Sequence, residues 1–260
     1  MQNNKIIFSG DSFTWGQGLQ YYGGFSDIKI MPGNQYIRSY LTDEHISYIK
    51  ENRYAKLVSR YFNYVEIVKP DNGGSDDESI KFIYGNINDD VKVVILQTTQ
   101  PARSNYNYYY KNEERIICGS ALHLDDNPES KMFREYLIEN NVDVDDWYMD
   151  LKKQIIKKIK DLATFLESKS IKFIILPWTN DYIQNFRNEP TLVEYLLKIN
   201  YKNFTYSSIQ SLMDMNQEFF IKSDYKKLGL NPPPDHHMSL DCHKLIAEMI
   251  IDKLKENITN

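Results

Sequence analysis

The chain is poor in cysteine, has no long apolar run and carries no excess of positive charge. Cys118 and Cys242 are its only cysteines among 260 residues, and neither belongs to a CxxC or Cys/His ligand pattern, so we expect no disulfide framework and no metal site. The longest apolar run, residues 173–178, has six residues, whereas a membrane span needs about 20. A formal net charge of −5 argues against nucleic acid or an anionic membrane as the main partner.

The N-terminal segment has no basic stretch followed by an apolar one. It therefore shows no secretory signal, and we expect a cytoplasmic protein. Hydrophobic residues make up 42% of the sequence, which is enough for a core without disulfide bonds. Because no low-complexity linker or internal repeat divides the chain, we expect one domain over residues 1–260, with its oligomeric state left open.

Short apolar runs alternate with helical patterns along the chain. Four runs predict buried strands, at 5–8, 64–68, 91–96 and 171–176. Apolar residues at spacings of three and four predict helices over 44–62, 150–167 and 240–254, the last one capped by Ser239. Strands that alternate with helices favour an α/β fold, a three-layer α/β/α sandwich with a mainly parallel central sheet.

Ligands of such a sheet collect at the carboxyl ends of its strands. The first predicted strand ends there on a polar turn, Gly10-Asp11-Ser12. Two stretches do not fit the alternation of strands and helices, residues 17–43 and 101–149, and we interpret both as insertions over this edge of the sheet.

Ser12 is the first candidate for chemistry. A serine at a strand-to-helix turn presents its hydroxyl beside free backbone N–H groups, an arrangement that suits a nucleophile with an oxyanion site. The alternative is that Ser12 only caps the following helix.

A second polar cluster, Asp235-His236-His237, precedes the last predicted helix. A serine hydroxyl is a weak nucleophile unless a neighbouring base takes its proton, and a histidine does so best when a carboxylate fixes its tautomer. Ser12, His237 and Asp235 could supply these three parts. His236 is the rival for the role of base, while His243 is either part of this cluster or a surface or capping histidine.

The segments GDSFTWG, at 10–16, and DHHMSLDCH, at 235–243, resemble the first and last sequence blocks of the SGNH/GDSL hydrolase family. Those blocks read Gly-Asp-Ser-x-Thr and Asp-x-His or Asp-x-x-His. The resemblance implies a flavodoxin-like fold, a serine esterase activity and no cofactor. It also implies that Ser12 is the nucleophile and donates its own N–H to the oxyanion, that His237 is the base, and that Asp235 orients it.

The two middle blocks of the family match less closely. The second block supplies a glycine N–H after the second strand, where Gly73 and Gly74 are both candidates. The third block carries an oxyanion asparagine after the third strand, and this sequence has none there. Thr99 stands at that position, and we expect its hydroxyl or the amide of Gln100 to donate instead.

Four residues are predicted to contact the substrate: Asp11, Trp15, Arg103 and His236. Arg103 would bind an anionic group, with a surface salt bridge as the alternative. Aromatic residues such as Tyr21, Tyr22 and the run 106–110 suit stacking on sugar rings, with packing among loops as the alternative.

The sequence thus predicts a serine esterase that removes a small acyl group, an acetyl group on a carbohydrate, through an acyl-enzyme on Ser12. One alternative is transfer of the acyl group to another hydroxyl by the same residues. The other is a catalytically weak carbohydrate-binding module on the hydrolase fold. Phosphate-ester chemistry is not favoured, because the chain has no GxxxxGK[ST] motif.

Overall fold

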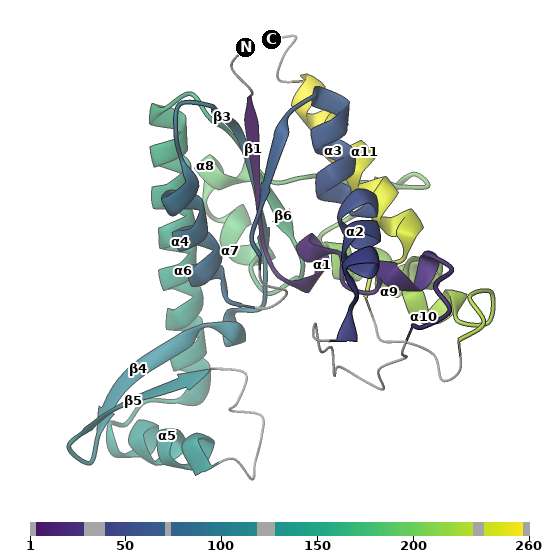
Figure 1. The fold of residues 1–260 in the computed structure, drawn as a ribbon. Coiled ribbons are helices and arrows are strands. Elements are labelled where there is room, and N and C mark those ends of the chain that lie inside the picture. The colour runs from purple at the N-terminus through teal and green to yellow at the C-terminus, as the bar shows by residue number, and fades with distance from the viewer. Residues whose placement is uncertain (1–3, 29–39, 71–73, 119–127, 231–236, 257–260) are drawn as a thin grey trace.

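A parallel β-sheet forms the centre of the molecule (Figure 1), in a computed structural model that describes residues 4–28, 40–70, 74–118, 128–230 and 237–256. Its strands follow the order β2-β1-β3-β6, with β1 at Lys5–Ser9, β2 at Val65–Val68, β3 at Val91–Thr98 and β6 at Lys172–Pro177. All three pairings are parallel. The four predicted strands are confirmed, each within two residues of its expected bounds.

The side chains of each strand alternate between two hydrophobic clusters. Ile7, Leu96 and Ile175 are fully buried in the cluster on one face of the sheet. Ile6 and Ile95 are fully buried in the cluster on the other face. A strand that is covered on both faces needs apolar residues at successive positions, which explains the unbroken apolar runs of the sequence.

Helices cover both faces of the sheet (Figure 1). Residues of α4 (Asp76–Asn86) and α6 (Val144–Ser168) belong to the first cluster, and residues of α3 (Tyr54–Phe62) and α11 (Leu240–Glu256) belong to the second. The predicted α/β fold, with a parallel sheet between helices, is therefore confirmed. Ser239 caps α11 as expected, because its hydroxyl accepts a hydrogen bond from the Cys242 N–H at 3.3 Å.

The single helix predicted over 44–62 is wrong, because the chain forms two helices there. α2 (Asp43–Asn52) ends at Arg53, whose backbone is extended with φ −73° and ψ 153°, and α3 begins directly after it. The break places the Arg53 guanidinium 3.1 Å from the Glu66 carboxylate on β2. It also leaves the N–H of Tyr54 without a helical acceptor, and His243 of α11 accepts it at 3.3 Å.

The stretch 101–149 contains structure of its own. A 3-10 turn, η3 (Pro101–Arg103), leads into an antiparallel hairpin of β4 (Asn105–Tyr110) and β5 (Glu113–Cys118), and α5 (Pro128–Glu139) follows. In Figure 1 the hairpin and α5 extend away from the sheet beside the N-terminal half of α6. Tyr106 and Tyr108 of the aromatic run pack on Phe133 of α5, so these two rings are used in packing.

The remaining elements are short. The stretch 17–43 contains η1 (Leu19–Tyr22), and its residues 29–39 lie outside the described part. After β6 the chain forms α7 (Ile183–Arg187), α8 (Pro190–Val193), the hairpin of β7 (Ile199–Tyr201) and β8 (Phe204–Tyr206), α9 (Ile209–Met215), η5 (Gln217–Phe219) and α10 (Ile221–Asp224). Within the described ranges, no helix combines the length and the apolar character that crossing a membrane requires.

Candidate active site

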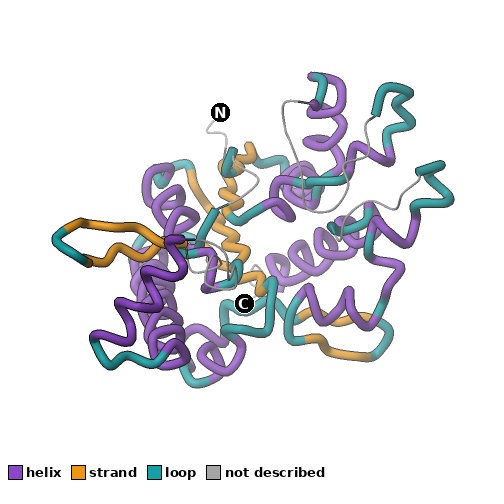
Figure 2. The backbone as a smooth tube through the Cα atoms, turned by 90° about the horizontal axis from the view of Figure 1, so that it is seen from below, coloured by secondary structure: helices purple, strands orange, loops and turns teal. Residues whose placement is uncertain are grey.

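The sheet order reverses between β1 and β3, and this reversal locates the candidate site. From β1 the chain goes first to β2 on one side and then to β3 on the other side. In open parallel sheets such a reversal opens a crevice at the carboxyl ends of the two strands. Figure 2 views the molecule from below, the end of the sheet where β1 gives way to α1 (Ser12–Trp15). The polar residues that follow β1 and β3 meet there.

Ser12 is the first residue of α1, a helix of one turn. The Asp11 carboxylate caps this turn by accepting the Phe13 N–H at 3.1 Å. As the first helical residue, Ser12 has a backbone N–H that no carbonyl of its own helix can accept. Its hydroxyl oxygen lies 2.9 Å from Nε2 of His237, 225 positions away in the sequence. The structure therefore brings together the predicted nucleophile and the predicted base.

His237 is held by its backbone and by its ring. Its carbonyl accepts the Ile221 N–H at 3.0 Å, and the next residue, Met238, forms an antiparallel bridge with Phe220. The imidazole stacks on the ring of Phe13, with 4.7 Å between centroids and 28° between planes. Phe13 in turn stacks on Trp178 at 3.5 Å. The residue after the predicted nucleophile thus supports the plane of the imidazole.

Asp11 is fully buried and paired on both oxygens. One oxygen accepts the Gln97 amide at 2.7 Å in addition to the Phe13 N–H, and the other accepts the Arg103 guanidinium at 2.8 Å. Because its side chain has no exposed surface, Asp11 does not fit the predicted role of contacting the substrate. Arg103 forms a salt bridge, as its alternative expected, but with a buried carboxylate instead of a surface one, and its own side chain keeps 36% of its surface exposed.

Gln97 extends this network behind the turn. Its carbonyl oxygen accepts the Thr14 hydroxyl at 2.6 Å, so the Tyr54 hydroxyl, 2.7 Å from Thr14, is left to donate to it. Gly10 makes this packing possible, because a Cβ there would lie 2.3 Å from the Thr14 hydroxyl and 2.8 Å from Cβ of Gln97. A fully paired polar network of this kind fixes the geometry of the turn.

The predicted oxyanion donors occupy different environments. Gly74 has φ +112°, and a Cβ there would lie 2.2 Å from the Glu78 carboxylate, so a glycine is required. Thr99 is fully buried, and its N–H already donates to Asp76 at 2.8 Å. Gln100 is exposed. Gly73 lies outside the described residues.

Asp76, the first residue of α4, is a fully buried carboxyl group at the same edge of the sheet. It accepts the Tyr182 hydroxyl at 2.7 Å as well as the Thr99 N–H. Burial raises the pKa of Asp76 to about 6, although both hydrogen bonds oppose the shift and the Asp11 charge adds to it. Burial and the Asp76 charge raise the pKa of Tyr182 well above its usual value, so its hydroxyl remains the donor.

The other predicted site residues are not brought to the Ser12 hydroxyl by the described part of the chain. Trp15 is only 3% exposed and packs with Leu19 and Ile49, so a substrate contact does not fit it. His243 is fully buried against Tyr54, and burial lowers its pKa to about 3, so it stays neutral. Asp235 and His236 lie outside the described residues.

Sequence reasoning missed five residues that shape this site: Phe13, Asp76, Gln97, Trp178 and Tyr182. Gln97 carried a usable signal, because it is the first polar residue after the buried run of β3. The Ser75-x-x-Glu78 pattern predicts the start of α4, and the structure forms that capping box, but the pattern does not reveal that Asp76 is buried. Stacking of Phe13 on Trp178 has no signal in the sequence.

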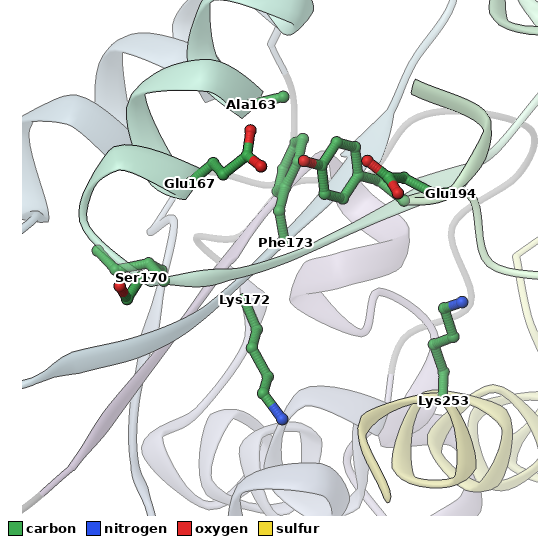
Figure 3. A pocket seen from close by; sticks show the side chains of 9 residues that line it. Ala163, Glu167, Ser170, Lys172, Phe173, Glu194 and Lys253 are labelled. Atoms are coloured by element: carbon green, nitrogen blue, oxygen red, sulfur yellow. The ribbon is translucent and has the colours of Figure 1, made fainter. Parts of the chain in front are cut away.

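The structure also bears on metal binding and on a cavity away from Ser12 and His237. Among the described residues, no group of three or more His, Cys, Asp and Glu side chains could hold a metal ion. A cavity of about 400 Å³ lies at the opposite end of the sheet, where β6 begins (Figure 3). Its lining includes Glu167, Lys172 and Glu194, and no residue of the Ser12 site contributes to it.

Comparison with known proteins finds distant similarities. No protein-family model and no curated protein matches the chain. The fold is similar to that of a lipolytic protein of the G-D-S-L family from Desulfitobacterium hafniense DCB-2, with 14% identity over 96% of this chain and 99% of that chain and a TM-score of 0.43. It is also similar to a carbohydrate esterase whose active site has divergent catalytic and non-catalytic binding functions, with 13% identity over 98% of this chain and 66% of that chain and a TM-score of 0.45. Since both TM-scores are below 0.5, the chemistry of this chain has to be inferred from its own side chains.

Proposed function

We propose that the protein is a serine esterase that hydrolyses a small ester through an acyl-enzyme on Ser12. The observation that supports this proposal is the distance of 2.9 Å between the Ser12 hydroxyl and Nε2 of His237, at the reversal point of a parallel sheet. A hydroxyl becomes a useful nucleophile when a neutral imidazole can accept its proton at this distance.

In the first half of the reaction, the Ser12 oxygen attacks the ester carbonyl while Nε2 of His237 takes the hydroxyl proton. A neutral imidazole that accepts at Nε2 carries its own proton on Nδ1. Asp235 is proposed to accept that Nδ1 proton and so to stabilise the imidazolium. The Phe13 ring keeps the imidazole in the plane that this transfer needs.

The oxyanion of the tetrahedral intermediate is proposed to accept the N–H of Ser12 and the N–H of Gly73 or Gly74. A hydroxyl or amide of Thr99 or Gln100 is proposed as a third donor. His237 then gives its proton to the leaving alcohol, and a water molecule, deprotonated by His237, releases the acyl group from Ser12. The loss of one oxyanion donor slows serine hydrolases by about 10²–10³-fold, so even two donors would leave measurable activity.

The substrate we propose is an acetyl ester of a carbohydrate. The acyl group must approach Ser12, a residue that is only 6% exposed and whose hydroxyl lies 2.9 Å from the His237 ring, and this burial favours a short acyl chain. The proposal that the alcohol part of the ester is a carbohydrate rests on the sequence analysis. A comparison of p-nitrophenyl acetate with the butyrate tests the acyl chain, and a screen of acetylated sugars tests the alcohol.

The decisive experiment compares the hydrolysis of p-nitrophenyl acetate by the wild-type protein, S12A and H237A, after subtraction of the uncatalysed rate. We expect both variants to lose at least about 10³-fold in kcat, because the nucleophile and its base act as one unit. S168A removes an exposed serine at the end of α6 and should keep the wild-type rate.

Labelling with a fluorophosphonate probe tests the nucleophile independently. The probe should modify Ser12 in the wild-type protein and leave S12A unlabelled. Full activity in H237A together with loss in S12A would move the role of base to His236. A wild-type protein that neither hydrolyses the ester nor reacts with the probe would be a binding module, and the proposal would be wrong.

A further inference from the structure

Asp76 is a buried carboxyl group for which the proposed mechanism has no use. It has no exposed surface and stands two residues after Gly74, a candidate oxyanion donor. The α4 helix that it opens is fixed by a capping box, in which the Ser75 hydroxyl accepts the Glu78 N–H and the Glu78 carboxylate accepts the Ser75 N–H. Its backbone is therefore firmly placed.

The two oxygens of Asp76 reach two other loops. One oxygen accepts the Thr99 N–H, directly after β3, at 2.8 Å. The other accepts the Tyr182 hydroxyl, in the loop after β6, at 2.7 Å. A single side chain thus joins the segments that follow β2, β3 and β6 at the carboxyl edge of the sheet, where Ser12 also lies.

We propose that Asp76 is a positioning residue for the oxyanion side of the site, and that its two hydrogen bonds hold the Gly74 and Thr99 segments in the arrangement that the tetrahedral intermediate requires. This inference rests on the proposed esterase function. A buried N–H has to be paired, so the Thr99 segment has a strong preference for the position that the carboxylate gives it. Misplacement of a catalytic group by about 1 Å can cost about 100-fold in rate.

The protonation state of Asp76 enters this arrangement directly. Burial raises its pKa to about 6, and among the described residues the groups that act on it are Tyr182 and Thr99, which lower the pKa, and Asp11, which raises it. An ionised carboxylate accepts both hydrogen bonds, whereas a protonated one has to direct its own hydrogen toward one of the two donors. One of the two bonds is therefore lost or reversed as the pH falls through about 6.

The test compares D76A, D76N and Y182F with the wild-type protein in p-nitrophenyl acetate hydrolysis. We expect D76A to lower kcat by up to about 100-fold with KM nearly unchanged. D76N should recover most of kcat at pH 8, because the asparagine oxygen accepts the Thr99 N–H and its amide can donate to the Tyr182 oxygen. Y182F removes one of the two bonds and should fall between D76N and D76A.

The pH profile separates positioning from a merely structural role. In the wild-type protein kcat/KM should fall as Asp76 takes up its proton near pH 6. D76N cannot take up this proton, so that part of the acid fall should be absent. D77N is the matched control, because Asp77 is the next residue of α4 and pairs with Lys158 at 2.6 Å, away from the loops that Asp76 joins. It should keep the wild-type kcat and profile.

The outcomes distinguish this inference from the proposed function. A wild-type protein without Ser12-dependent hydrolysis would overturn both. A wild-type protein that hydrolyses the ester, with D76A at full kcat well below its melting temperature, would overturn the role of Asp76 alone. If D76A does not fold, D76N decides: an acid limb identical to that of the wild-type protein would overturn the role of Asp76.

Discussion

At the scale of single residues, Asp11 shows how a buried charge can hold the turn that carries the proposed nucleophile. The carboxylate has no exposed surface and accepts hydrogen bonds from Phe13, Gln97 and Arg103. A desolvated carboxylate is stable only when its oxygens are paired. The Arg103 guanidinium supplies the one positive charge among these three donors, so we expect the Ser12 turn to depend on it.

The variant R103M tests this dependence. It keeps a long aliphatic side chain but leaves the Asp11 carboxylate without its cation, so we expect the free energy of unfolding to fall by about 2 kcal/mol. The hydrolysis rate should fall with it, because Asp11 caps the turn that carries Ser12. Urea unfolding and ester hydrolysis measure the two effects.

The matched control is R60M. Arg60 pairs with Glu51, and both side chains are about half exposed, so the loss should be less than about 0.5 kcal/mol. An R103M protein as stable as R60M, with an unchanged hydrolysis rate, would show that Asp11 does not need Arg103.

How far the sequence predicts individual site residues depends on what each one does. The proximity of Ser12 and His237 is predictable, because the roles proposed for them, nucleophile and base, restrict the residue type, and both residues stand in recognisable segments. Gln97 stands out only as the polar residue that ends an apolar run, and Asp76 does not stand out at all, because an aspartate at the start of a helix is common on surfaces. Their roles arise from partners 86 and 106 positions away in the sequence.

At the scale of elements, apolar periodicity predicts strands better than helix boundaries. The four sheet strands are covered on both faces, so their apolar runs are unbroken and their ends are visible. The pattern over 44–62 continues through Arg53, and arginine is a good helix former, so the sequence does not show that the backbone is extended there. The hairpin of β4 and β5 was not predicted, because β4 ends in three consecutive tyrosines and β5 begins with three charged residues. Neither strand has the unbroken apolar run that marks the strands of the central sheet.

The contact between α3 and α11 makes the stability of the fold sensitive to acid. His243 of α11 accepts the Tyr54 N–H of α3 and stays neutral, because burial lowers its pKa to about 3. The ordinary histidine pKa is about 6.5, so below that pH the unfolded chain binds a proton that the folded chain does not. Stability is therefore lost as the pH falls from about 6.5 to about 3.

Asp76 acts in the opposite direction. Its pKa is about 6 in the folded chain and about 3.9 for an ordinary aspartate, so the folded chain binds the proton first as the pH falls. The folded state is therefore stabilised as the pH falls from about 6 to about 3.9. From pH 7 to pH 5, we expect His243 to lower the free energy of unfolding by about 2 kcal/mol and Asp76 to raise it by about 1 kcal/mol.

The variants H243N and D76N separate the two contributions. H243N keeps an acceptor for the Tyr54 N–H but does not titrate, so acidification from pH 7 to pH 5 should stabilise it relative to the wild-type protein. D76N should be destabilised relative to the wild-type protein over the same interval. Thermal unfolding at pH 7, 6 and 5 measures both differences, and an identical pH dependence in all three proteins would contradict the assignment of His243 as buried and neutral.

At the scale of the whole molecule, the aromatic side chains form a packed unit away from the sheet. Phe133 of α5 is fully buried, and its ring centroid lies within 6 Å of those of Tyr106, Tyr108, Tyr136 and Trp147, at 5.5, 4.8, 5.7 and 5.1 Å. This unit comprises the β4–β5 hairpin, α5 and the N-terminal end of α6. Because α6 continues onto the sheet, it joins the unit to the central core (Figure 1).

The variant F133A tests whether this unit can open by itself. Loss of a buried phenylalanine costs about 3–5 kcal/mol, and we expect that cost to fall on the hairpin and α5, whose aromatic rings surround Phe133. We expect amide hydrogen exchange to accelerate over 105–118 and 128–139 while β1 and β3 keep their protection. I138A is the control, since Ile138 lies on the same helix with 74% of its surface exposed and should change little. Equal acceleration in β1 and β3 would instead mean that the unit and the sheet unfold as one body, and that Phe133 stabilises the Ser12 turn as much as it stabilises the hairpin.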